Sequence, residues 1–144
     1  MALFAPIVHC ETLSDWDWEV FYQAAEIWHL MVYNSSSDWY MDGDDFDNIC
    51  QQVANKYGIS VDDASDTIFD VTEYGYILES DQEGKALDEL GDKLDALPDW
   101  ATYEDGVRVH REVASNYGIS LIQLHAIEFA DEVWWWYYDY YYYY

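Results

Sequence analysis

Apolar residues recur at intervals of three and four along most of this chain, which is the spacing of one face of an α-helix. The clearest case lies in residues 85–98, where four leucines share one predicted face and a proline ends the helix. Another helix is predicted for residues 15–33 after an N-cap at Ser14, and only YGYIL (74–78) suggests a short strand. The pattern therefore predicts an all-α or mainly α fold. The four leucines are Leu87, Leu90, Leu94 and Leu97.

An octapeptide occurs twice, as VANKYGIS at 53–60 and as VASNYGIS at 113–120. The surrounding segments 38–60 and 99–120 align with a single-residue gap, so the repeat is longer than the octapeptide. In each copy the glycine suits the left-handed position that ends a helix, and the serine suits the N-cap of the next helix. The predicted turn residues are Gly58 with Ser60 and Asp63, and Gly118 with Ser120 and Gln123, each Ser opening a capping box.

The repeated unit resembles the helix-turn-helix of bacterial DNA-binding proteins, in which a small residue precedes the turn glycine by four positions. Ala54 and Ala114 occupy that position here, and Ala64 and Leu124 stand where the family shows an aliphatic residue. A recognition helix needs Arg, Lys, Asn or Gln towards base edges, whereas the first unit offers VDDASDTIFDVTE. The resemblance thus covers the shape and not the chemistry of DNA binding.

One domain is expected, since 144 residues with 51% hydrophobic content suffice for one core. We predict a single acidic helical domain over 1–144. It contains two helix-turn-helix-like units at about 38–78 and 99–138, an aromatic helix before them, and an aromatic tail at 133–144.

Thirty Asp and Glu face five Lys and Arg, which gives a formal net charge of −25. Such a charge excludes nucleic acid and anionic membranes as direct partners. No apolar run approaches the roughly 20 residues of a membrane span, and the N-terminus lacks the basic region of a signal peptide. Two cysteines without CxxC spacing fit a reducing compartment. We therefore expect a cytoplasmic protein, in the host bacterium if a phage encodes it.

The carboxylates follow helical faces instead of alternating with lysines. Duplex DNA carries one charge per about 1.7 Å, so 25 charges correspond to about 42 Å of duplex, close to the diameter of a chain this long. In size, charge and helical layout the chain resembles the acidic DNA-mimic inhibitors of bacteriophages that block restriction enzymes and CRISPR effectors. The expected phosphate-mimic residues are Asp42, Asp44, Asp45, Asp47, Asp62, Asp63, Asp66, Asp70, Glu73, Asp88, Asp92 and Asp95.

The resemblance implies a basic nucleic-acid-binding partner, such as a nuclease or a CRISPR or restriction complex. A non-enzymatic adaptor that binds a protein through aromatic side chains remains the alternative hypothesis for the function. A second copy of this chain, in a homodimer, remains an alternative partner. Ten aromatic residues crowd the last twelve positions, and Trp and Tyr often anchor interfaces. The expected aromatic contact residues are Trp134, Trp135, Trp136, Tyr137, Tyr138 and Tyr140.

Catalytic and metal-binding motifs are not found, so we expect no enzyme, no cofactor and no metal. The four histidines have no ligand spacing, and His29, within an apolar helix, is expected in the core or at its rim. Asp38, Asp42 and Gly43 fit three positions of a calcium loop, but Tyr40 and Ile49 stand where two ligands would be needed.

Overall fold

The computed structural model describes residues 13–34, 41–75 and 81–143, and these residues form six α-helices. The all-α expectation is confirmed, and the described ranges contain no strand. Tyr74, where a short strand was expected to begin, belongs to a helix, and 76–78 lie outside the described residues. The helices are α1 (Asp15–Asn34), α2 (Gly43–Tyr57), α3 (Val61–Tyr74), α4 (Asp81–Asp95), α5 (Tyr103–Tyr117) and α6 (Leu121–Tyr143).

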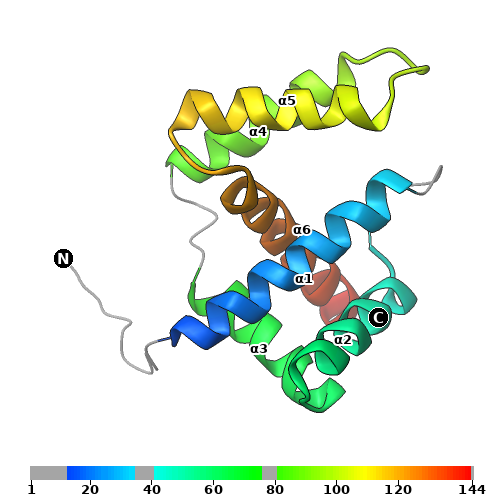
Figure 1. The fold of residues 1–144 in the computed structure, drawn as a ribbon, viewed down its shortest axis with the longest axis vertical. Coiled ribbons are helices and arrows are strands. Elements are labelled where there is room, and N and C mark those ends of the chain that lie inside the picture. Colours follow the sequence, from blue (N-terminus) through cyan, green and yellow to red (C-terminus); the bar gives the residue numbers. More distant parts are fainter. Residues whose placement is uncertain (1–12, 35–40, 76–80, 144) are drawn as a thin grey trace.

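The helix α6 links the two ends of the molecule (Figure 1). Its first part adjoins α4 and α5, which pack on each other, and its later part runs beside α1 and α3. α2 packs along α3, and both also contact α1. None of the described helices combines the length and the hydropathy of a membrane span.

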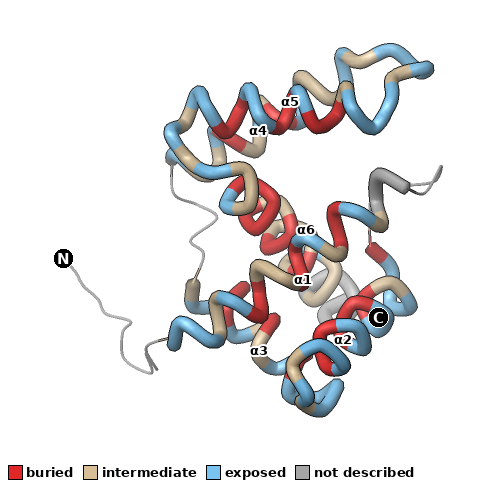
Figure 2. Tube along the Cα trace, viewed as in Figure 1, coloured by how far each residue is buried: buried red, intermediate tan, exposed pale blue. Residues whose placement is uncertain are grey.

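Two groups of buried residues form the core, and Figure 2 colours buried residues red. The larger group joins α1, α2, α3 and α6 around Phe21, Ile68 and Phe129, all fully buried. The smaller group joins α4 and α5 to the first turn of α6 around Leu90 and Leu124. Within the predicted leucine stripe only Leu90 is buried, because α4 is covered by few neighbours; Leu87, Leu94 and Leu97 are half-buried.

The repeated turns have the predicted geometry. Gly58 and Gly118 both lie in the left-handed region at φ 66°, and the next residue donates its backbone N–H to the carbonyl of Ala54 or Ala114. The hydroxyl of Ser60 accepts a hydrogen bond from the backbone of Asp63 at 3.0 Å, which is one of the two bonds of the predicted capping box. The second turn completes the reciprocal box, in which Gln123 donates to the hydroxyl of Ser120 and accepts from its backbone N–H.

The two units pack differently beyond the turn. α2 and α5 are each 15 residues long, and each begins after a capping box, at Asp42 and Asp45 or at Thr102 and Asp105. However, α2 packs chiefly along α3, the helix after its turn, whereas α5 packs chiefly along α4, the helix before it. The repeat is confirmed for the turn, and two equivalent helix-turn-helix units are not established.

The acid-rich segment 34–48, whose polar composition favours a loop, is partly helical. α1 extends to Asn34, and α2 begins at Gly43, with Asp42 as its N-cap. The cap explains the difference, because the Asp42 carboxylate satisfies a backbone N–H that would otherwise be unpaired at the helix start. Residues 43–49 belong to α2 and so do not form the second half of a calcium-binding loop at 38–49. Asp38 lies outside the described residues.

Candidate functional site

Five carboxylates of α3 lie on one side of the helix. At about 100° of rotation per residue they fall within an arc of about 100°, and all five are exposed. The opposite side buries Ala64, Ile68 and Val71 in the larger core group. Burial of this apolar face positions the acidic face in solvent. The five residues, called the α3 acidic face below, are Asp62, Asp63, Asp66, Asp70 and Glu73.

The four predicted carboxylates near the start of α2 divide into two roles. Asp42 accepts a hydrogen bond from the backbone of Asp45 at 2.8 Å, and Asp45 accepts one from the backbone of Asp42 at 3.2 Å. These two acids therefore cap the helix. Asp44 and Asp47 are exposed and take no part in that box.

The remaining three predicted carboxylates, Asp88, Asp92 and Asp95, are exposed on α4. Because α4 packs on α5, they lie at the opposite end of the molecule from α2 and α3 (Figure 1). The sequence placed all twelve acids in one predicted site, whereas tertiary structure separates them into two groups.

Basic side chains are concentrated at the α4–α5 end. Residues 13–34 and 41–75 contain thirteen Asp and Glu and one basic residue, Lys56. The other four basic residues lie on α4 and α5, where Lys93 pairs with Glu112 at 2.7 Å and Arg108 with Asp105 at 2.7 Å. The contact between Lys93 and Glu112 holds α4 against α5 and raises the pKa of Lys93.

Aromatic residues of α6 pack against α2 and α3. Trp136 stacks on Phe46 with 4.7 Å between ring centroids, and Tyr137 lies 4.8 Å from Phe69. Trp136 and Tyr137 thus support the fold, while the next-door Trp135 is 65% exposed. Trp134 is half-buried, and the side chains of Tyr138 and Tyr140 lie outside the described part.

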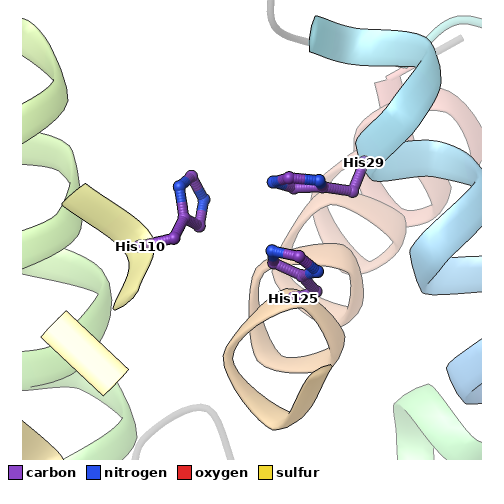
Figure 3. A group of neighbouring side chains, drawn as sticks. All are labelled: His29, His110 and His125. Atoms are coloured by element: carbon purple, nitrogen blue, oxygen red, sulfur yellow. The ribbon is translucent and has the colours of Figure 1, made fainter. Parts of the chain in front are cut away.

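Three histidines that are remote in sequence meet between the two core groups. His29 comes from α1, His110 from α5 and His125 from α6, and each is less than a tenth exposed. The rings of His29 and His125 stack with 3.5 Å between centroids, and His110 faces this pair (Figure 3). One ring nitrogen of each lies within 4.8 Å of those of the other two. This group is called the histidine cluster below.

Hydrogen bonds orient one member of the histidine cluster. Nδ1 of His110 lies 2.8 Å from the carbonyl oxygen of Gly106, and its Nε2 lies 2.8 Å from Oε2 of Glu128. A carbonyl oxygen only accepts, so Nδ1 carries the proton of that contact. The carboxyl group of Glu128 is therefore held beside Nε2, the nitrogen that faces the other rings.

Burial controls the charge of the other two imidazoles. It lowers the pKa of His29 to about 2, with further lowering by the neighbouring His125 and His110. It lowers the pKa of His125 to about 4, again with help from His110. Both rings are consequently neutral near pH 7, each with a nitrogen lone pair available for binding.

Further acids continue the face of α6 that carries His125 and Glu128. Burial raises the pKa of Asp131, and it raises the pKa of Glu132 despite a hydrogen bond from the backbone of Met41. That bond spans 2.6 Å and ties α6 to the residue just before α2. Burial therefore disfavours the charged forms of these two acids.

Sequence reasoning missed the histidine cluster and Glu128. It placed His29 correctly in the core, but it treated each histidine alone because their separations of 81 and 15 residues match no ligand motif. One local signal was present, since His125 and Glu128 stand three residues apart on one helix face. The other two histidines come from α1 and α5, and only the packing of these helices on α6 brings them to His125.

Comparison with known proteins found no match: no family model, no curated protein and no solved structure is similar to this chain.

Proposed function

We propose that this protein is a DNA-mimic inhibitor that occupies the nucleic-acid groove of a basic host protein. The α3 acidic face carries the proposal. A solvated helix face usually interleaves both signs of charge, which offsets the repulsion between like charges four residues apart. Here five carboxylates share one arc, and α3 contains no basic residue at all.

The spacing of these charges matches that of a DNA strand. From Asp62 to Glu73 the helix rises about 16 Å, so its five carboxylates supply one charge per about 4 Å of axis. One strand of B-DNA supplies one phosphate per about 3.4 Å. A cationic groove that fits one phosphate row therefore meets a comparable charge density on α3.

The mechanism is competitive occlusion of the groove. Phosphate-binding Lys and Arg of the target would bind the α3 carboxylates, and release of counterions would favour the encounter as it does for DNA. Because α3 is held by the larger core group, its carboxylates are positioned before binding. The target class that the resemblance favours is a bacterial defence nuclease, of the restriction or CRISPR type.

The experiment first identifies a target protein and then compares two matched variants of this protein. The protein, immobilised, is incubated with bacterial lysate, and retained proteins are identified at low and at high salt. One variant then replaces Asp62→Asn, Asp66→Asn and Glu73→Gln on α3, and the control replaces Asp88→Asn, Asp92→Asn and Asp95→Asn on α4. Both remove three negative charges from exposed positions.

The expected result is capture of basic nucleic-acid-binding proteins that weakens steeply with salt. The α3 variant should lower the association rate with the captured protein at least about tenfold, and the α4 control much less. If both variants lowered the association rate equally, the α3 acidic face would contribute only through the net charge of the protein. Capture of a protein without a nucleic-acid groove, insensitive to salt, would favour the adaptor hypothesis, with the exposed Trp135 as its first contact to test.

A further inference from the structure

We propose that His29, His110, His125 and Glu128 form a binding site for one divalent transition-metal ion of the zinc class. The ligands come from three helices, and this inference is independent of the proposed inhibition. The three imidazoles and one carboxylate match the ligand set of a four-coordinate zinc site.

The distances are close to those that a metal requires. In tetrahedral zinc coordination, metal–nitrogen bonds of about 2.0–2.1 Å separate the ligand atoms by about 3.3 Å. The three ring nitrogens here are within 4.8 Å of one another. Each side chain would therefore move by less than about 1 Å, which rotation about the Cα–Cβ and Cβ–Cγ bonds supplies. Figure 3 shows nitrogen atoms of all three rings facing one another.

One buried nitrogen of the histidine cluster lacks a hydrogen-bond partner in the described part of the chain and could bind a metal ion. Nε2 of His125 is buried and has no hydrogen-bond partner among the described residues, and the residue is only 7% exposed. An unsatisfied buried nitrogen destabilises a fold, and native structures rarely keep one without a bound water or ion. A metal ion would use this lone pair directly.

The neighbours of His110 resemble the outer shell of a metal site. The bond from Nδ1 to the Gly106 carbonyl leaves Nε2 to act as the ligand, which is the arrangement that orients metal-binding histidines in other proteins. Oε2 of Glu128 lies 2.8 Å from that Nε2, a distance near the separation of two ligands on one ion. The carboxylate of Glu128 is not among the groups that lie within 4.8 Å of one another, so it would have to turn towards the ion to serve as the fourth ligand.

The chemistry of the ligands selects the metal. Imidazole nitrogens favour zinc, copper and nickel, whereas calcium and magnesium require oxygen ligands. The carboxylate of Glu128, beside His110, compensates part of the charge of the ion.

The position of the site indicates a structural role. His29 belongs to a helix of the larger core group, and His110 belongs to the α4–α5 pair. A bound ion would therefore join the two ends of the molecule through α6. The described structure also joins α5 to α1 through aromatic contacts of His29 with Tyr103 and His110.

The experiment uses the full chain without a polyhistidine tag, freed of metal by a chelator and then titrated with Zn²⁺ or Co²⁺. Mg²⁺ serves as the matched ion, because it binds the acidic surface diffusely but not imidazoles. We expect one Zn²⁺ per chain, visible Co²⁺ absorption typical of tetrahedral coordination, and a rise in Tm of about 5–10 °C at a hundredfold excess over Kd. Mg²⁺ should produce none of these specific effects.

Two variants separate ligation from packing. His125→Phe keeps an aromatic ring beside His29 but cannot bind metal. Glu128→Gln removes the carboxylate charge and keeps the size of the side chain, which is 15% exposed. We expect His125→Phe to abolish the Zn²⁺-induced Tm shift and Glu128→Gln to weaken Zn²⁺ affinity at least about tenfold. If His125→Phe fails to fold, the affinity of Glu128→Gln and the Co²⁺ spectrum decide. Absence of stoichiometric Zn²⁺ binding, or unchanged binding in Glu128→Gln, would overturn the proposal and leave a packed histidine trio.

Discussion

At the scale of single residues, His110 combines two roles. Each of its ring nitrogens lies 2.8 Å from an oxygen, one of a carbonyl and one of a carboxyl group. The first contact fixes a proton on Nδ1, and the second holds the carboxyl group of Glu128 beside Nε2. Burial keeps His29 and His125 neutral near pH 7.

This neutrality predicts a pH-dependent stability for the metal-free protein. The folded pKa values of His29 and His125 lie below the unfolded value of 6.5, so the unfolded chain binds more protons below that pH. Each histidine should lower the free energy of unfolding by up to about 1.4 kcal/mol per pH unit as the pH falls from about 6 to 4. Above pH 6.5 these two histidines add no pH dependence to the free energy of unfolding.

Urea unfolding of the metal-free wild type and of His125→Phe at several pH values measures this. The difference between the two proteins isolates His125, because Asp131, Glu132 and the net charge act on both. Tyr103, His110 and Glu128 also face the cluster and are kept in the variant. A difference that does not change between pH 6.5 and 4 would show that His125 is protonated in the fold.

The turn glycines give a second prediction at this scale. Gly58→Ala and Gly118→Ala should each lower the free energy of unfolding by about 1 kcal/mol, since an L-residue is strained at φ 66° although no atom lies within 4 Å of the added Cβ. The control is Gly91→Ala on the exposed side of α4, also free of contacts, which should stabilise by about 0.5–1 kcal/mol. Urea unfolding compares the three; a neutral Gly58→Ala would contradict the assigned strain.

At the scale of elements, α6 determines the tertiary structure because it contacts both groups of the core. Leu124 in its first turns belongs to the smaller group, and Phe129 and Val133 belong to the larger one. Its apolar residues are not confined to one face, which fits a central helix with neighbours on several sides. Its aromatic end, Trp136 with Phe46 and Phe69, extends this contact to α2 and α3.

Adjacent tryptophans of α6 provide a matched test of that contact. Trp136→Ala should lower the free energy of unfolding by about 2–4 kcal/mol, because it removes a ring stacked on Phe46 and Phe69. Trp135→Ala should cost less than about 1 kcal/mol, since its side chain is mostly exposed. Urea unfolding of both variants checks the difference; equal losses would mean that the end of α6 does not pack as described.

At the scale of the whole molecule, charge is distributed unevenly around a conventional helical core. The α1–α3 part carries thirteen acids and only Lys56, while the α4–α5 part contains the other basic residues and their ion pairs. Self-repulsion within the first part opposes folding. The same unneutralised negative charge makes the α3 acidic face well suited to a cationic partner.

Salt should therefore stabilise this protein. We expect Tm to rise between about 10 mM and 0.5 M NaCl, because the Debye length falls from about 30 Å to a few ångströms and screens the repulsion. The Asp62→Asn, Asp66→Asn, Glu73→Gln variant should gain about 0.5–1 kcal/mol at low salt and show a smaller rise. Thermal unfolding in both salts, with the α4 triple variant as control, tests this. A Tm that falls with salt in the wild type would refute it.

The sequence by itself determined what depends on neighbours along the chain. Helical periodicity predicted the fold class, Gly58 and Gly118 predicted the turns, and Ser60 and Ser120 predicted the caps, because backbone strain and capping are local interactions. The exposure of the α3 acidic face followed from the same periodicity. The N-cap at Asp42 was missed, although it too is local, because acid-rich polar runs also occur in loops.

Tertiary structure alone decided which distant residues meet. It separated Asp88, Asp92 and Asp95 from the acids of α2 and α3, because α4 buries its leucines against α5. It also brought His29 and His110 to His125, since α1 and α5 both pack on α6. Contacts between residues tens of positions apart depend on how helix faces combine in the core, and one helix's periodicity carries no information about the partner that covers it.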